Sequence, residues 1–413
     1  MRTWTLSGIF WLAALHVVGQ STLPFDARVD LNRGFRNTVA LSGLFDYNAN
    51  TVRNEFPLAI LKGGFLERDL RDRVSDGLKE KGNTAGFILS GRIQWTGAGC
   101  WTDKPNWRPI VSVAHHEQSG LSFTADQFDL TFFGNSGFQE RTAILAPSAY
   151  QQIRYQTVGG GVLDQRSGSF VRFDVIRGQS MARADVRWAS LFTGADGRVL
   201  RSALLGDYVA SDTAGSGFDR TKGLGGAISA RWAFTSRRNE AIRFGMGVED
   251  LGVIVWNKNS VQVDQDTLIR FVGWQVENLF ALDAVLVNEQ AVVDTFGLGY
   301  GTSRITQLAP FRLYADVSLP LGSHRRLDVS LEHRHLPGFI PQLNVQGSQV
   351  IGSRTMLGAT LSYGGFGGLR LGFAAKRRFG EHVLVTLSTP QLPGLMTSRV
   401  SGIGMLVGVS IGL

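Results

Sequence analysis

The last thirteen residues of the chain, Ser401 to Leu413, alternate between two kinds of side chain. Apolar residues occupy every second position from Ile403 onward, glycine and serine fill most positions between them, and only Leu406 interrupts the pattern. Period two is the repeat of a β-strand, so the segment predicts a strand with one apolar face and one face nearly without side chains. At about 3.3 Å per residue it is roughly 40 Å long, enough to cross a bilayer at the tilt of a membrane barrel.

The same period recurs along most of the chain. In residues 309–318 and 325–334, leucine, valine and alanine hold one phase, whereas arginine and acidic residues hold the other. No apolar run reaches the roughly 18 residues that mark a membrane helix. Glycine, at 51 of 413 residues, often lies inside strand-like runs, where it makes room on a crowded inner face. We therefore expect an all-β, transmembrane antiparallel barrel of about 14 strands, an even number as in bacterial barrels.

The chain opens with the pattern of an exported protein. Arg2 precedes an apolar stretch from Ile9 to Val18, and small residues around Gly19 and Ser21 permit cleavage. The apolar stretch is about ten residues, half of the roughly 20 that a spanning helix needs. We expect residues 1–20 to be a signal peptide.

Composition excludes several classes of function. A single cysteine, Cys100, forbids an intramolecular disulfide and a cysteine metal site. The net charge is +8, but the basic residues are dispersed without a cluster or a recognition helix, so we expect no nucleic-acid partner. Only seven of the 42 basic residues are lysine, and arginine suits pairing with carboxylate or phosphate. Outer-membrane lipid and the phosphates of lipopolysaccharide, or anions in the lumen, are the expected partners.

Charged residues confined to one phase of their strands are the candidate lining of the lumen. Two interpretations stay open: these residues only fill and rigidify the interior, or they line a selective anion pathway. The candidates are Arg172, Asp174, Arg183, Asp185, Arg187, Arg231, Arg243, Glu249, Arg312, Asp316, Asp328, Glu332 and Arg370.

One early segment, Phe65 to Lys81, has a helical period instead. Acidic and basic residues spaced i, i+4 and Gly82 at the C-cap position favour a short amphipathic helix. Its apolar stripe is Leu66, Leu70, Val74 and Leu78. We expect a plug-like segment in the periplasmic mouth or the lumen, with an interfacial helix as the alternative. Residues 21–84 would then hold N-terminal strands and this plug, and residues 85–413 the barrel.

Three other segments complete the prediction. Residues 121–133 alternate and are assigned to a strand. Residues 138–146, stopped by Pro147, are assigned to a helical turn in a loop. Residues 276–293 are ambiguous between helix and strand.

The chain contains no familiar catalytic or nucleotide-binding motif. Ser330 and His333 lie on opposite phases of one strand, so they cannot form a dyad within it. His333 and His335 share a face and could ligate a metal, but no ligand at matching spacing supports them, and polar lumen or interface residues are the alternative. His115 and His116 are interpreted as rim residues. We expect no enzyme and no cofactor.

Four stretches resemble a known family: residues 128–135, 244–257, 271–274 and 402–413. They are similar to an uncharacterised family of Bacteroidota outer-membrane β-barrels that carries a domain of unknown function. The run from Glu249 to Gly252 after an alternating strand also resembles long-chain fatty-acid transporter barrels and the type IX secretion barrel related to them. The resemblance implies a barrel with an N-terminal plug-like segment and offers no catalytic residues to carry over.

Two functions stay open for a barrel in the outer membrane. The first is passive transport of a small hydrophobic or amphipathic molecule, which predicts a continuous or lateral opening. The second is a non-transporting barrel that anchors or assists surface-protein secretion or assembly, as in type IX secretion or gliding, which predicts an occluded lumen and large loops. A soluble secreted β-sandwich is the structural alternative.

Overall fold

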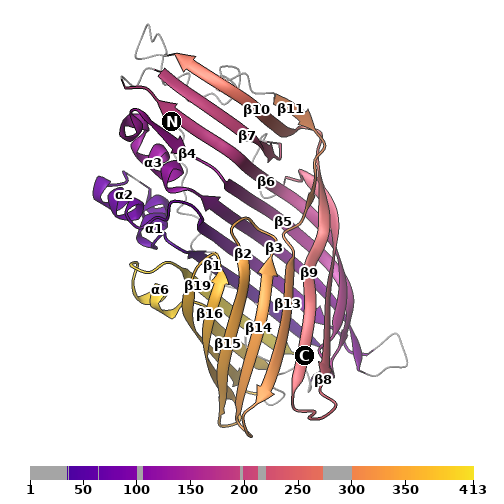
Figure 1. Ribbon diagram of the computed structural model, residues 1–413. Coiled ribbons are helices and arrows are strands. Elements are labelled where there is room, and N and C mark those ends of the chain that lie inside the picture. Colours follow the sequence, from indigo (N-terminus) through magenta and orange to yellow (C-terminus); the bar gives the residue numbers. More distant parts are fainter. Residues whose placement is uncertain are drawn as a thin grey trace.

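The computed structural model describes residues 35, 37–63, 65–99, 106–195, 199–212, 220–272 and 300–413. Its main feature is an antiparallel sheet that closes on itself (Figure 1). The circuit has 14 strands, as the alternation predicts. In order around the barrel they are β1 (Thr38–Ala49), β2 (Asn83–Thr96), β3 (Trp107–Phe123), β5 (Ser148–Asp164), β6 (Phe170–Thr193), β8 (Gly223–Thr235), β9 (Arg243–Trp256), β13 (Arg312–Pro320), β14 (Arg325–Arg334), β15 (Ile340–Ile351), β16 (Thr355–Gly365), β17 (Leu369–Phe379), β18 (Val383–Thr389) and β19 (Ile403–Gly412).

The last strand closes the barrel against the first. β19 pairs with β1 from Thr38↔Gly412 to Tyr47↔Ile403. Its apolar phase faces outward, where Met405 is 47% exposed, and its glycine phase faces the lumen. Leu406, the one residue that interrupts the alternation, is buried on the inner face. The 14 strands of the circuit therefore close into a barrel without an edge strand.

Part of the sheet continues beyond the barrel. The first half of β6, up to Gly178, pairs with β8 inside the circuit. The second half, from Ala182, pairs instead with β7 (Val199–Ala210), and β7 pairs with β10 (Ser260–Val272). Three short strands complete the set: β4 (Arg141–Ile144) on β6, β11 (Tyr300–Ser303) on β10 and β12 (Thr306–Leu308) on β9. This extension rises above one end of the barrel in Figure 1.

Short helices lie at the same end, opposite the paired ends of β1 and β19 at Thr38 and Gly412. They are α1 (Glu55–Lys62), α2 (Arg68–Ser75), α3 (Ala125–Phe133), the 3-10 helix η3 (Asn135–Phe138) and α6 (Leu392–Met396). α1, α2 and α3 share an apolar core built around Phe56, Val74 and Phe128. In the described part of the chain, no helix is both long and apolar enough to span a membrane.

Two local predictions are wrong. The segment 121–133 is not one strand, because β3 ends at Phe123 and α3 begins at Ala125. The Thr124 side chain caps α3 by accepting a hydrogen bond from the Gln127 amide at 3.1 Å. The segment 138–146 is not a helical turn, because it forms the end of η3 and the strand β4. The predicted strand at 27–34 and the ambiguous segment 276–293 lie outside the described residues.

Candidate functional site

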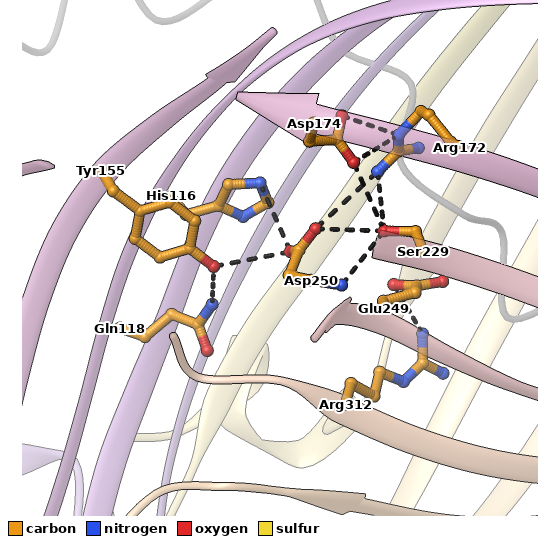
Figure 2. A network of polar contacts seen from close by, with 9 residues as sticks. All are labelled: His116, Gln118, Tyr155, Arg172, Asp174, Ser229, Glu249, Asp250 and Arg312. Carbon is orange, nitrogen blue, oxygen red and sulfur yellow. Dashed lines mark hydrogen bonds and ion pairs between the residues drawn. The ribbon is translucent and has the colours of Figure 1, made fainter. Parts of the chain in front are cut away.

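The lumen holds a network of polar side chains that comes from five neighbouring strands of the wall, with one more residue from a sixth (Figure 2). Apart from Asp250, the members face inward because side chains of a strand alternate between its two faces. They are His116 and Gln118 on β3, Tyr155 on β5, Arg172 and Asp174 on β6, Ser229 on β8, and Glu249 and Asp250 on β9, with Arg312 of β13 beside Glu249.

Asp250 lies at the centre because β9 has a bulge there. The register between β8 and β9 shifts between Ile228 and Ala230, so that Glu249 and Asp250 together oppose Ser229. Asp250 adopts φ 55°, a left-handed conformation, and asparagine and aspartate tolerate it better than most residues. The extra residue lets two successive acidic side chains lie on the lumen side.

The Asp250 carboxylate gathers four partners. It lies 3.7 Å from Arg172 Nη2 and 3.8 Å from His116 Nε2. It accepts hydrogen bonds from the hydroxyls of Tyr155 and Ser229, both at 3.4 Å, and its own amide donates to Ser229 Oγ at 3.1 Å. The His116 ring stacks on Tyr155 at 4.9 Å between centroids. Side chains from β3, β5, β6 and β8 therefore meet at one carboxylate on β9.

Arg172 and Asp174 form the most buried ion pair of the network. Arg172 Nε donates to both Asp174 oxygens, at 2.8 and 2.9 Å, and the two side chains are 1% and 0% exposed. Arg172 also donates to Ser229 Oγ at 3.2 Å. Charges this deep are tolerated only when paired and hydrogen-bonded.

Further pairs extend the charged lining around the barrel. Arg312 contacts Glu332 at 2.7 Å and Glu249 at 3.7 Å, which joins β9, β13 and β14. Arg231 and Asp316 form a two-pronged pair at 2.9 Å. Arg370 on β17 contacts Asp46 on β1 at 3.0 Å, although β18 and β19 lie between these strands, and also donates to Gln342 at 2.6 Å.

Five of the predicted lining residues lie apart from these pairs. Arg183 pairs with Asp207 of β7 at 2.8 Å, in the half of β6 beyond the barrel circuit. Asp185 and Arg187 are exposed on that same half. Arg243 and Asp328 are half-buried, and Arg243 is the first residue of β9.

Alternation alone missed several central residues. His116 was interpreted as a rim residue, but β3 continues past it to Phe123, and the side chain is buried in the lumen. Asp250 was not a candidate because a regular strand would turn it outward, opposite to Glu249. The sequence offered one signal for the bulge. Aspartate tolerates a left-handed backbone conformation better than most residues, and here it follows another acidic residue.

Two turns at the helix-bearing end reach across the barrel to the inner face of β2 and β3. They bring in residues 336–339, between β14 and β15, and Phe366, between β16 and β17; we call these residues the lumen stopper. Leu336, Phe339 and Phe366 form a buried cluster. They rest on inward-facing glycines of the far wall: a Cβ on Gly86 would lie 2.3 Å from the Phe366 ring, and one on Gly120 would lie 2.5 Å from the Pro337 oxygen. Only residues without a side chain permit this approach.

The predicted plug helix lies at the rim. The stripe of Leu66, Leu70, Val74 and Leu78 packs into the core that α2 shares with α1 and α3. Arg71 on the same helix donates to the Phe132 carbonyl of α3. The lumen stopper comes from the β14–β15 and β16–β17 turns and not from this helix.

The network is built for structural pairing. Ser229 hydrogen-bonds to the carboxylates of Asp174 and Asp250, at 3.5 and 3.4 Å, so its oxygen is aimed at acids and not at a base that could activate it. Among the described residues no group of three or more histidine, cysteine or acidic side chains has the arrangement of a metal site. The site is a lumen lined by paired charged side chains, with the apolar lumen stopper at its helix-bearing end.

No family model matches the chain, and no curated protein matches it. Several solved structures are similar over nearly the whole chain. A mutant of the TodX monoaromatic hydrocarbon channel is 8% identical, covers 93% of this chain and 92% of its own, and has a TM-score of 0.45. The toluene transporter TodX of P. putida is 9% identical, with coverages of 91% and 90% and a TM-score of 0.41. A FadL homologue of Pseudomonas aeruginosa is 9% identical, with coverages of 92% and 90% and a TM-score of 0.38.

Proposed function

We propose that this protein is an outer-membrane barrel for passive passage of a small amphipathic or hydrophobic molecule, closed at rest by the lumen stopper. The connections from Pro320 to Arg325, Ile351 to Thr355 and Phe379 to Val383 are short and share one end of the barrel. The opposite end carries the helices and the long connections. Outer-membrane barrels have short periplasmic turns and longer extracellular loops. This orientation would place α2 at the cell surface and not in the periplasmic mouth that the sequence suggested.

The stopper is the observation that carries the proposal. Its contacts are mainly apolar: the rings of Phe339 and Phe366 meet edge to face at 5.1 Å, and Leu336 packs beside them. One hydrogen bond ties it to the far wall, from Thr84 Oγ1 to the Phe366 carbonyl at 2.7 Å. Two turns held mainly by van der Waals contact can move aside without breaking the hydrogen-bonded wall.

The lumen below the stopper favours an amphipathic molecule over a wholly apolar one. Its walls present guanidinium and carboxylate groups such as Arg231, Asp316 and Glu332. A polar end could exchange hydrogen bonds with these groups during passage, whereas a hydrocarbon would only separate them from their partners. Passage requires the paired side chains to swing aside along with the stopper.

A second function, a non-transporting anchor for surface-protein secretion or assembly, draws support from the same lumen. Arg172, Asp174 and Tyr155 are fully buried, and a lumen packed at this level suits a barrel that presents its outer end to a partner. The helices and the β6–β7–β10 extension would be the partner surface.

Flux measurements on reconstituted protein separate the two functions. Vesicles that contain wild-type protein or the double variant Phe339→Ala, Phe366→Ala are compared for uptake of a graded series of amphipathic probes. The control is Phe373→Ala, because Phe373 lies on the same hairpin as Phe366 but faces outward and is exposed. We expect slow uptake by wild type and by the control, and faster uptake by the double variant. If none of the three passes any probe, passive transport is wrong and the anchoring function stands.

A further inference from the structure

A basic cleft lies at the helix-bearing end, outside the lumen. Its volume is about 480 Å³, and it is lined by Arg53, Glu55, Arg73 and Arg399. A smaller hollow of about 300 Å³ shares Arg53, Glu55 and Arg73 and extends to Asn50 and Lys79. Three separate segments supply the walls: the β1–α1 connection with the start of α1, helix α2 with the residues after it, and the residues that lead into β19.

A buried asparagine holds two of these walls together. The Asn54 side chain donates to the Gly402 carbonyl and accepts from the Gly402 amide, both at 2.7 Å, and the residue is fully buried. Beside it, the Asn54 amide donates to the Val400 carbonyl at 2.8 Å and the Glu55 amide to the Ser398 carbonyl at 3.0 Å. Arg53 and Arg399, which are distant in sequence, are thereby fixed at the same opening.

The cleft has an excess of positive charge. Its one carboxylate, Glu55, is 3.6 Å from Arg73. Within the described part of the chain, neither Arg53 nor Arg399 has an acidic partner within the 4.0 Å that defines an ion pair. Both residues are exposed, and two guanidinium groups at one opening can bind the oxygens of a single phosphate in parallel.

The two helices that adjoin the cleft, α1 after Arg53 and α6 before Arg399, carry exposed apolar side chains. Ile60 and Leu61 near the end of α1 are 51% and 71% exposed, and Leu395 and Met396 of α6 are 51% and 82% exposed. The backbone bonds to Ser398 and Val400 place the start of α1 beside the segment that follows α6, and Figure 1 shows both helices along the same rim. Cationic groups next to exposed apolar side chains match a molecule with a phosphate head and acyl chains.

We infer that this cleft binds the phosphate of a membrane lipid headgroup, with Arg53 and Arg399 as its principal ligands and Arg73 as a third. The acyl chains would lie along the apolar side chains of α1 and α6. The site is separate from the lumen, so it would tether the rim helices to the membrane whether or not the barrel transports.

Lipid binding by the intact protein in a nonionic detergent tests this site. Diphosphorylated lipid A is the probe, and binding is measured by native mass spectrometry for wild type and for Arg53→Gln, Arg399→Gln. The control is Arg238→Gln, an exposed arginine in the β8–β9 turn at the other end of the barrel. We expect the double variant to lose roughly tenfold or more in lipid affinity and the control to match wild type. Equal binding by all three proteins would overturn the inference.

Two further arms identify the source of the phosphate and cover a variant that does not fold. Wild-type protein should bind dephosphorylated lipid A as poorly as the double variant binds the intact lipid, and equal binding of both lipids by wild type would overturn the site. Inorganic phosphate should compete only weakly, because it makes no apolar contact with α1 or α6. If inorganic phosphate binds as tightly as the lipid, the cleft is a site for free phosphate and the lipid assignment is wrong.

Discussion

Arg172 on β6 reaches Asp250 on β9, with 3.7 Å between Nη2 and the nearer carboxylate oxygen, although β8 lies between the two strands. Ser229 of β8 lies between them and contacts both side chains. The strands β6, β8 and β9 are thus joined through side chains inside the lumen as well as through the backbone hydrogen bonds of the wall. The bulge at Asp250 makes the side-chain connection possible, because it turns the carboxylate inward.

Replacing Arg172 with leucine should destabilise the barrel strongly. The change leaves the carboxylates of Asp174 and Asp250 buried with one cation fewer, and breaking a buried ion pair costs about 3–5 kcal/mol. The matched control is Asp207→Asn, which breaks the more exposed Arg183–Asp207 pair and should cost about 0–1 kcal/mol. Urea unfolding in detergent, followed by the loss of the heat-modifiable folded band, gives both values. Equal losses in the two variants would show that water reaches Arg172 and that the pair is not desolvated.

The barrel itself could be predicted because alternation is a property of single strands. Each lipid-crossing strand must show an apolar face and a lumen face, so β13, β14 and β19 could be recognised one at a time. The segment 121–133 could not, because Phe128 and Phe132 fit an i, i+4 helix as well as a strand. The cap at Thr124 marks where the helix begins.

The site was less predictable than the fold. Alternation offered Arg172, Asp174, Glu249 and Arg312 as candidates, but it says which face a residue takes and not which strands meet. The Arg370–Asp46 contact joins strands far apart in sequence. The stopper depends on glycines in β2 and β3 that accept turns from the opposite wall, a relationship that only the closed barrel creates.

Adding one methyl group at Gly120 should dislodge the stopper. In Gly120→Ala, the new Cβ would lie 2.5 Å from the Pro337 carbonyl oxygen and 3.1 Å from the Phe366 ring, and such overpacking costs about 1–3 kcal/mol. We expect a lower thermal midpoint and a measurable ion conductance in planar bilayers. Gly347→Ala is the control, since nothing lies within 4 Å of its Cβ position. An unchanged conductance in the Gly120 variant, together with a lower midpoint, would mean that the lumen is blocked below the stopper as well.

Removing the Asn54 side chain should loosen the rim. In Asn54→Ala, the buried Gly402 loses both the acceptor for its amide and the donor to its carbonyl, at about 1–3 kcal/mol for each group left unpaired. We expect faster trypsin cleavage after Arg399 in the folded protein, because the segment before β19 would open more often. Asn259→Ala, which removes an exposed hydrogen bond to Asp212, should leave that cleavage rate unchanged. Equal rates would show that the backbone bonds alone hold the segment.

Acidification should weaken the turn that carries the stopper. His335 is exposed on one side, but its pKa lies below its ordinary value of 6.5, chiefly because the packed side of the ring loses hydration. The charges of His333 and Arg183 lower the pKa further. The ring stacks on Phe311 at 5.0 Å.

Because the pKa of His335 is lower in the folded protein, the folded protein binds fewer protons than the unfolded chain below about pH 6.5. The stability that neutral His335 contributes is therefore complete above about pH 6.5, and it is lost as the pH falls through the folded-state pKa. We expect the urea midpoint of the wild type to drop as the pH falls below about 6.5. The drop should be smaller in His335→Phe, which keeps the stacking and does not titrate. It should be unchanged in His324→Gln, because this histidine lies in the β13–β14 turn at the other end of the barrel, away from the stopper. If His335→Phe shows the full wild-type drop, another group controls the acid response and the turn is not sensitive to pH.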